Sequence, residues 1–436
     1  MDTERTIIVL DDDPTGTQTV RQVPVLTGWS VEEIKEEFER NTPLFFILTN
    51  TRAFPEEVAQ GINRAIGEAI RQTKRPFWVI SRGDSTLRGH FPSETDALAE
   101  GLGWGDDFLY VLLPAFFEGR RFTQGDVHYL QEQGRFVPVG ESEYAKDETF
   151  GYRNSNLKDW VEEKSEGRIQ ASQISSLSIQ ELEGSNDVHL LQVITQADRA
   201  LIVNAIDMRH IDRFSAVVAR SSRRIVFRTA ASFVSSFGGF GKVPLLTAEA
   251  LKAENGAGGG LIIVGSHVPK TTLQLSELLK ADVDALEFDI ATYLQSGQGY
   301  VQGLSLEIQS RLSQNRDVVV YTSRTLRKGN DRDDSLRLST QISDGLVGLV
   351  SSLPVQPSFL ISKGGITSSD IATKGLKISR AMVMGQVLPG VPVWRADAGS
   401  KFPGLKYVIF PGNVGEADSL FQAYQKIKND KNTPQA

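Results

Sequence analysis

Residues 45–80 read FFILTNTRAFPEEVAQGINRAIGEAIRQTKRPFWVI, and this stretch decides the fold class. Two short apolar runs, Phe45–Leu48 and Phe77–Ile80, flank a segment whose apolar residues recur close to the 3.6-residue period of an α-helix. Pro55 suits the first turn of that helix, which we expect over Pro55–Arg71. A buried strand, a helix and a second buried strand make a unit whose two strands run parallel.

Similar apolar runs recur on both sides of this unit. In the first half they are Ile7–Leu10, Phe108–Leu112, Leu201–Val203 and Ile225–Phe227. In the second half they are Leu261–Val264, Val318–Tyr321, Phe359–Ile361 and Tyr407–Phe410, with helices expected over Lys270–Leu279, Ser335–Val350 and Val414–Ile427. The runs are continuous rather than alternating, which is typical of parallel strands buried on both faces. The sequence therefore predicts an α/β fold with mainly parallel sheets.

The chain is long enough for more than one domain. It has 436 residues, and its most linker-like stretch is Ala253–Gly260, which is rich in glycine. We therefore place a boundary near 250–260 and expect α/β domains over 1–250 and 258–436, with a ligand cleft between them. The polar segment Glu141–Asp187 is an excursion or subdomain, and the tail Lys428–Ala436 has the composition of a disordered end.

Composition and charge limit the class of protein. The chain has 47 Lys and Arg against 54 Asp and Glu, a net charge of −7, so nothing favours a nucleic-acid partner. It has no cysteine, which excludes disulfides, thiolate zinc sites, iron–sulfur clusters and cysteine nucleophiles. No run approaches the ~20 apolar residues of a membrane span, and the first residues do not form a signal peptide. We expect a cytoplasmic protein without membrane contact.

Acidic residues follow the first expected strand. Asp11-Asp12-Asp13-Pro14-Thr15-Gly16 begins where Ile7–Leu10 ends, and ligands of open α/β sheets bind beyond the carboxyl ends of the strands. A carboxylate there could take a proton from a substrate hydroxyl or hold Mg²⁺. The same residues are also good turn formers, so a plain turn is the alternative.

Arginines follow two other strands. Ser81–His90 contains Arg82 and Arg88 with small hydroxyl residues and glycines between them, a set suited to binding a carboxylate and its neighbouring hydroxyls. A surface loop with incidental arginines is the alternative. Arg120 and Arg121, in the segment after Phe108–Leu112, add positive charge to the same edge if the strands are ordered as expected.

Glycine-rich turns follow three strands in the second half. They are Gly265-Ser266, Ser362–Asp370 and Phe410–Glu416, each leading toward a helix. Such turns aim backbone N–H groups at phosphate, although each could also be an ordinary helix cap. The dinucleotide, Walker A, HExxH and G-x-S-x-G patterns are absent, which disfavours a dehydrogenase, a zinc enzyme and an α/β-hydrolase.

In this order, these blocks resemble the four-carbon acid sugar kinase family, formerly described as a domain of unknown function. Its members phosphorylate threonate, erythronate or 3-oxo-tetronate with ATP. The resemblance runs from Ile7 to about Asp418 and rests on six motifs. They are Asp12–Gly16, Asp84–Gly89, Pro114–Arg120, Gly265-Ser266, Gly364–Thr367 and Gly412–Gly415. The chain departs from the family pattern at Ile366, where an acidic residue is common, and at Phe410-Pro411, where Lys-Ser is usual.

The resemblance implies a sugar-acid-binding N-terminal domain and an ATP-binding C-terminal domain, with Mg²⁺ on the ATP phosphates. We expect Asp12 to be the catalytic base, with Asp13 the second choice. The residues expected to bind the sugar acid are Arg82, Asp84, Ser85, Thr86, Arg88 and Gly89. Those expected to bind ATP are Ser266, Gly364, Gly365, Ile366, Thr367, Gly412 and Asn413, and no residues suggest a dedicated metal cage.

We therefore expect transfer of the ATP γ-phosphoryl group to the terminal hydroxyl of a four-carbon sugar acid. A non-catalytic regulatory protein that binds a sugar acid or nucleotide is the alternative. The expected partners are small molecules, and the sequence is compatible with a homo-oligomer.

Overall fold

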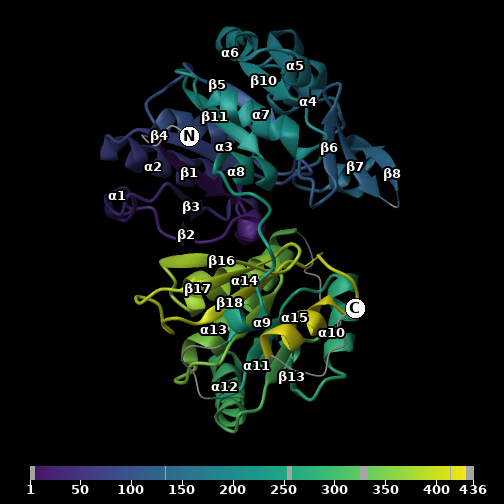
Figure 1. Cartoon of the computed structure of the whole chain (residues 1–436). Helices are drawn as coiled ribbons and strands as arrows, with labels where there is room; N and C mark the ends of the chain where they lie inside the picture. The colour runs from purple at the N-terminus through teal and green to yellow at the C-terminus, as the bar shows by residue number, and fades with distance from the viewer. Residues whose placement is uncertain (1–4, 133, 253–257, 325–331, 413, 429–436) are drawn as a thin grey trace. The chain divides into compact units, whose positions relative to one another are not determined.

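The structure is a computed structural model that describes residues 5–132, 134–252, 258–324, 332–412 and 414–428. The chain divides after Val243 into an N-terminal and a C-terminal unit (Figure 1). Part of the linker expected over Ala253–Gly260 (253–257), and the tail after Lys428, lie outside the described residues. No described helix is long and apolar enough to cross a membrane.

The N-terminal unit contains a sheet whose neighbouring strands all pair in parallel. Its order is β2 (Val23–Leu26), β3 (Leu44–Leu48), β1 (Thr6–Asp11), β4 (Phe77–Arg82), β11 (Ile225–Thr229), β5 (Leu109–Leu113), β10 (Ala200–Val203) and β9 (Ile174–Leu177). The register brings strand ends together, because Asp11 at the end of β1 pairs with Leu48 of β3 and Arg82 of β4. Loops after these three strands therefore meet at one edge.

Helices connect these strands. The α-helices are α1 (Val31–Glu39), α2 (Glu56–Thr73), α3 (Ser93–Gly101), α4 (Leu157–Lys164), α5 (Ile179–Gly184), α6 (Asp187–Gln196), α7 (Met208–Val218) and α8 (Ala231–Phe237). Short 3-10 helices are η1 (Pro14–Thr19), η2 (Thr51–Ala53), η3 (Val139–Glu141), η4 (Glu143–Lys146) and η5 (Ala171–Gln173).

Both faces of this sheet are buried. Ile66 and Ile70 of α2 share a core with Val79 of β4, which confirms the amphipathic helix predicted between the two strands. The neighbouring Trp78 points to the other face, where it meets Phe237 of α8 edge to face at 5.7 Å. This two-sided burial explains why the strands read as continuous apolar runs.

The polar segment Glu141–Asp187 belongs to the N-terminal unit rather than standing apart. It contributes the edge strand β9, and Trp160 of α4 is 1% exposed in the same core as Ile66. A small antiparallel sheet precedes it: β6 (Arg121–Gln124), β7 (Val127–Glu132) and β8 (Arg135–Pro138). The sequence reading missed this small sheet.

The C-terminal unit has a second, mixed sheet. The strands β13 (Asp284–Phe288), β14 (Val318–Thr322), β12 (Leu261–Val264), β15 (Leu360–Lys363) and β18 (Lys406–Phe410) pair in parallel in this order, followed by antiparallel β17 (Val391–Ala396) and β16 (Arg380–Leu388). The helices are α9 (Ala248–Leu251), α10 (Pro269–Leu278), α11 (Ile290–Ser296), α12 (Gln298–Ser313), α13 (Arg332–Ser352), α14 (Gly365–Asp370), the π-helix η6 (Ile371–Gly375) and α15 (Ser419–Lys428). The predicted α/β class with mainly parallel sheets in two domains is confirmed.

Candidate functional site

Three consecutive aspartates lie where β1 ends, at the carboxyl edge of the N-terminal sheet. Asp11 and Asp12 are 1% and 3% exposed, and Asp13 caps η1 by accepting a hydrogen bond from the backbone N–H of Thr15 at 2.8 Å. Gly16 passes so close to the Asp11 carboxylate that a Cβ there would overlap it. The turn is therefore built around the buried acids, so the plain-turn explanation does not account for all of it.

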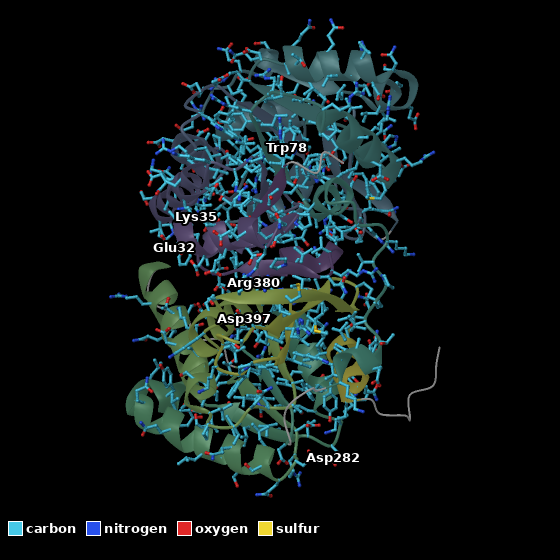
Figure 2. The ribbon with its side chains drawn as sticks, turned by 60° about the vertical axis from the view of Figure 1, so that its left-hand side comes forward. Glu32, Lys35, Trp78, Asp282, Arg380 and Asp397 are labelled. Carbon is cyan, nitrogen blue, oxygen red and sulfur yellow. The ribbon has the colours of Figure 1, made fainter. Side chains whose placement is uncertain are left out.

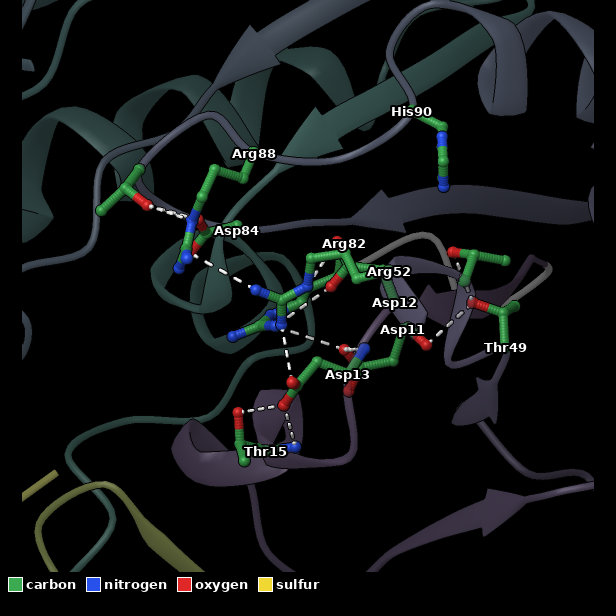
Figure 3. A network of polar contacts seen from close by, with 12 residues as sticks. Asp11, Asp12, Asp13, Thr15, Thr49, Arg52, Arg82, Asp84, Arg88 and His90 are labelled. Carbon is green, nitrogen blue, oxygen red and sulfur yellow. Dashed lines mark hydrogen bonds and ion pairs between the residues drawn. The ribbon is translucent and has the colours of Figure 1, made fainter. Parts of the chain in front are cut away.

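Arg52 lies at the centre of the acidic groups (Figure 3). It follows β3, and its guanidinium is 2.8 Å from Asp13, 3.3 Å from Asp12 and 3.8 Å from Asp84. About a fifth of its side chain is exposed, so it borders both solvent and the buried carboxylates. One cation thus joins residues from the loops after β1, β3 and β4.

Arg88 and Asp84 form a second pair beside Arg52. Arg88 Nε lies 2.7 Å from Asp84, and its Nη1 lies 3.6 Å from Asp147. The guanidinium also stacks over the ring of Tyr144 at 5.0 Å from its centroid. About a quarter of the Arg88 side chain is exposed, which leaves it accessible to a ligand.

Arg82 belongs to a buried layer beneath this surface. It is 5% exposed, with Nη1 3.3 Å from Asp11 and 3.7 Å from Asp12. Arg228 of β11 lies in the same layer, 3.5 Å from Glu94. Its guanidinium fills the space that a side chain at residue 83 would need. These arginines counter the charge of the buried acids, which would otherwise be costly to hold out of water.

Two buried side chains hold the loop after β4 in place by hydrogen bonds to its backbone. His128 Nε2 donates to the carbonyl of Ser85 at 2.8 Å, and the Tyr152 hydroxyl donates to the carbonyl of Thr86 at 2.6 Å. Burial lowers the pKa of His128 to about 4, so the imidazole is neutral at pH 7. Thr86 in turn donates to Asp84, and Gly89 has φ +127°, a conformation that glycine adopts readily.

Burial and neighbouring arginines separate the pKa values of the acids. Burial raises the pKa of Asp11 to about 8 and that of Asp12 to about 6, against the opposing attraction of Arg82 and Arg52. Burial also acts to raise the pKa values of Asp13 and Asp84, but Arg52 and local hydrogen bonds outweigh it and lower both. Asp12 is therefore the acid of this group that titrates just below neutral pH.

The arrangement suits proton transfer better than metal binding. Both carboxylate oxygens of Asp12 lack a hydrogen-bond donor among the described residues, so they can accept one from a ligand. No cluster of three or more His, Cys, Asp or Glu in the described part of the chain is arranged to hold a metal ion. The surrounding arginines already neutralise the aspartates, so this set does not fit a Mg²⁺ cage.

A second cluster lies at the carboxyl edge of the C-terminal sheet. The Thr271 hydroxyl lies 3.1 Å from both Ser266 Oγ and the carbonyl of Gly412. A Cβ at Gly364, which has φ +123°, would lie 3.2 Å from the Cβ of Ser266, and a Cβ at Gly412 would lie 3.2 Å from its Oγ. Three turns predicted separately from the sequence therefore meet around Ser266.

Lys363 fastens these turns together. The residue is fully buried, and its Nζ donates to the carbonyls of Pro411 and Gly412 while lying 4.3 Å from the centre of the Phe410 ring. Burial, with a smaller effect of Lys270, lowers the pKa of Lys363 to about 7. The buried amino group thus holds the loop after β18 against the end of β15.

Arg324 adds a cation to this cluster. It follows β14, and its Nη2 donates to the carbonyl of Ser266 at 2.9 Å and to Thr272 Oγ1 at 2.8 Å. Its Nε and Nη1 make no hydrogen bond to described residues. An anion that approached Ser266 would meet this guanidinium.

The structure brings together most residues that the sequence singled out. Asp12, Asp13, Arg82, Asp84, Ser85, Thr86, Arg88 and Gly89 gather at the carboxyl edge of the N-terminal sheet, and Ser266, Gly364, Gly365, Thr367 and Gly412 at that of the C-terminal sheet. Ile366 is 56% exposed beside this second group, and Asn413 lies outside the described residues.

The sequence reading missed Arg52, Arg324, His128 and Arg228. Arg52 and Arg324 each follow a predicted strand, so inspecting every strand end would have found them. Arg228 directly follows the predicted run Ile225–Phe227, so the same inspection would have found it. His128 reaches the site from within β7, a strand that the sequence did not predict.

Comparisons with known proteins assign both units. The family model described as a sugar-binding N-terminal domain matches residues 7–237. The chain belongs to this family. A second model, described as a nucleotide-binding C-terminal domain, matches residues 261–420. The protein thus has a sugar-binding and a nucleotide-binding domain, each containing one of the two clusters. A search of curated proteins found no match.

Two solved structures share the fold over nearly the whole chain. A Haemophilus influenzae protein of the DUF1537 family has a TM-score of 0.67 and 17% identity, covering 96% of this chain and 100% of its own. A Salmonella typhimurium LT2 protein described as a candidate tRNA synthase has a TM-score of 0.69 and 18% identity, covering 96% and 98%. At these identities the likeness extends to the fold alone.

Proposed function

We propose that the protein is an ATP-dependent kinase that phosphorylates the terminal hydroxyl of a four-carbon sugar acid such as threonate, erythronate or 3-oxo-tetronate. The observation that carries this proposal is Asp12, a buried carboxylate with raised pKa and unoccupied hydrogen-bonding capacity, in a sugar-binding domain beside Arg52. The accompanying nucleotide-binding domain supplies the second requirement of a kinase.

Asp12 suits the role of general base better than its neighbours. A base for a hydroxyl at neutral pH works best when its pKa lies near the working pH, and that of Asp12 is about 6. Asp13 is held as a carboxylate of low pKa by Arg52 and Thr15, and Asp11 is protonated at pH 7 because its pKa is about 8. Asp12 therefore accepts the hydroxyl proton as the oxygen bonds to the γ-phosphorus, while the bond from that phosphorus to the bridging oxygen breaks and ADP leaves.

The carboxylate of the sugar acid binds Arg88 and Arg52 in this proposal. Their side chains are 24% and 19% exposed, whereas that of Arg82 is only 6% exposed and already lies against Asp11 and Asp12. Asp84, Ser85 and Thr86 accept or donate hydrogen bonds at the substrate hydroxyls. Arg82 holds the acids in place instead of gripping the substrate.

ATP binds the glycine-lined turns around Ser266. Gly364, Gly365 and Gly412 carry no side chain that would keep phosphate from the backbone, and Arg324 offers it N–H groups that make no hydrogen bond to the described residues. ATP would bring Mg²⁺ bound to its phosphates, and the cation would neutralise charge there. The chain's own residues position the two ligands and exclude water from the reacting groups.

A coupled ADP-release assay with ATP, Mg²⁺ and a panel of four-carbon sugar acids tests the proposal. Turnover with at least one acid is expected, and Asp12→Asn lowers kcat by about 10²–10⁴ if Asp12 is the base. The kcat/KM of the wild type is expected to decrease as the pH is lowered through about 6, because protonated Asp12 cannot accept a proton. A loss smaller than about tenfold in Asp12→Asn would move the base elsewhere.

The alternative is a regulatory protein that binds the same ligands without turnover. Thermal stabilisation by a sugar acid and by ATP, with no ADP released for any acid in the panel, would favour it over the kinase.

A further inference from the structure

A cavity in the N-terminal unit lies away from the aspartates. It has a volume of about 1030 Å³ and includes Thr6, Leu44 and Trp78, which lie near the amino ends of β1, β3 and β4. Asp11, Arg52 and Arg82 lie at or beyond the opposite, carboxyl ends of these strands. A strand of this length separates the two places by roughly 15–20 Å.

The lining of this cavity is positively charged although the chain as a whole is acidic. Its charged residues are Arg5, Arg21, Arg75, Arg220 and Asp212. Arg220 is paired with Asp187 at 2.9 Å, and Asp212 accepts a hydrogen bond from Ser236 at 2.6 Å. Within the part of the chain that the structure describes, Arg21 and Arg75 form no ion pair. As far as the described residues show, Arg21 and Arg75 therefore give the cavity positive charge that no acidic side chain pairs with.

Three aromatic residues, which together form the aromatic wall, line the same cavity. Trp78, Phe237 and Phe38 line the cavity and are 5%, 6% and 7% exposed. The Arg5 guanidinium lies over the ring of Trp78, which is labelled in Figure 2, with its Cζ 4.5 Å from the ring centroid. A ligand that buried a flat apolar body here would pack on rings and keep an anionic group near arginine.

We propose that this cavity is a second ligand site, which binds a small organic anion with an aromatic or similarly flat apolar body. Arg21 and Arg75 bind the anionic group, and Trp78 with Phe237 contacts the apolar part. Size supports this choice, since ligand pockets commonly measure about 300–1000 Å³ and combine an apolar lining with a few charged groups. A small hydrophilic sugar acid would leave the aromatic wall unused.

The site is independent of the proposed kinase activity. A ligand there would contact the starts of the strands whose ends carry Asp11, Arg52 and Arg82. Because the length of the strands separates the two edges, binding at one edge can be measured without substrate at the other.

Anilinonaphthalene sulfonate is a suitable probe because it joins a sulfonate to a flat aromatic body. N-phenylnaphthylamine is its neutral counterpart. Titration of the full chain with the sulfonate is expected to give one saturable site that quenches tryptophan emission, with a smaller quench in Trp78→Phe. Replacing both Arg21 and Arg75 by Gln is expected to weaken sulfonate binding about tenfold and to leave binding of the neutral probe unchanged.

Two matched variants locate the effect. Lys74→Gln removes an exposed cation next to Arg75 that does not line the cavity, so sulfonate binding should persist. Asp12→Asn changes the other edge and should also leave it intact. Absence of saturable sulfonate binding, or equal binding by the Arg21→Gln/Arg75→Gln variant and the wild type, would overturn the proposal. An unchanged far-UV circular dichroism spectrum and a cooperative thermal transition show that each variant keeps its fold.

Discussion

At the scale of single residues, Arg52 organises the candidate sugar site. It is the cation shared by Asp12, Asp13 and Asp84, and its charge lowers the pKa values of the latter two. Partly buried acids at this density repel one another, so their ionised state depends on a cation held in place. Arg52 therefore acts both on the shape and on the proton affinity of the site.

Replacing Arg52 by Met should remove that charge while keeping most of the side-chain volume. We expect turnover to fall by about 10²-fold and the acidic limb of the pH–rate profile to move to higher pH, because Asp12 loses its nearest cation. Arg52→Lys should restore part of the rate. Kinetics over a range of pH measure both effects.

Arg71→Met is the matched control for this prediction. Arg71 is an exposed arginine in the last turn of α2 with no ion pair to the described residues, so its loss should leave the pH profile unchanged. An unshifted profile in Arg52→Met would mean that Arg52 does not tune Asp12.

At the scale of secondary structure, α2 and α3 approach each other through glycines. A Cβ at Gly67 of α2 would lie 2.5 Å from the carbonyl oxygen of Leu98, and Gly101 of α3 passes equally close to the backbone of Arg64. These contacts let the two helices cover the same sheet face that carries Val79. The sequence showed the helix period but gave no sign of which glycine faced a neighbour.

Gly67→Ala and Gly61→Ala make a paired test within α2. Gly67→Ala should destabilise the protein by about 1–3 kcal/mol, because backbone atoms of α3 must move. At Gly61 nothing lies within 4 Å of the added Cβ, so alanine should stabilise by about 0.5–1 kcal/mol through helix propensity. Urea unfolding of the full chain compares them, and equal shifts in midpoint would contradict the close packing.

At the scale of the whole molecule, the two units have separate binding tasks. The N-terminal unit matches a sugar-binding domain and the C-terminal unit a nucleotide-binding domain, each with its cluster at the carboxyl edge of its own sheet. Binding of one ligand can therefore be damaged without damaging binding of the other.

Lys363→Met tests this separation. Without the amino group, the carbonyls of Pro411 and Gly412 lose their donor and the loop after β18 loosens. We expect ATP to stabilise this variant less than the wild type in thermal unfolding, with the stabilisation by a sugar acid kept. Equal loss of both effects would point to general damage. Arg52→Met should show the reverse pattern.

The sequence by itself determined the α/β class, the main strands and the acidic and glycine-rich turns. The continuous apolar run Phe45–Leu48 indicates a strand buried on both faces, and the spacing of apolar residues in Pro55–Arg71 indicates a helix. The strand-end rule likewise pointed to Asp12, Arg88 and Ser266 before any contact was known.

Only the tertiary structure decided which charges meet and which remain accessible. Arg82 and Arg88 look alike in the sequence, yet one is buried against Asp11 and the other borders solvent. Strand order and register likewise bring Arg52 from after β3 to Asp12 and Arg228 from β11 to Glu94. Proton affinity depends on burial and on neighbours in space, neither of which is contained in the local order of residues.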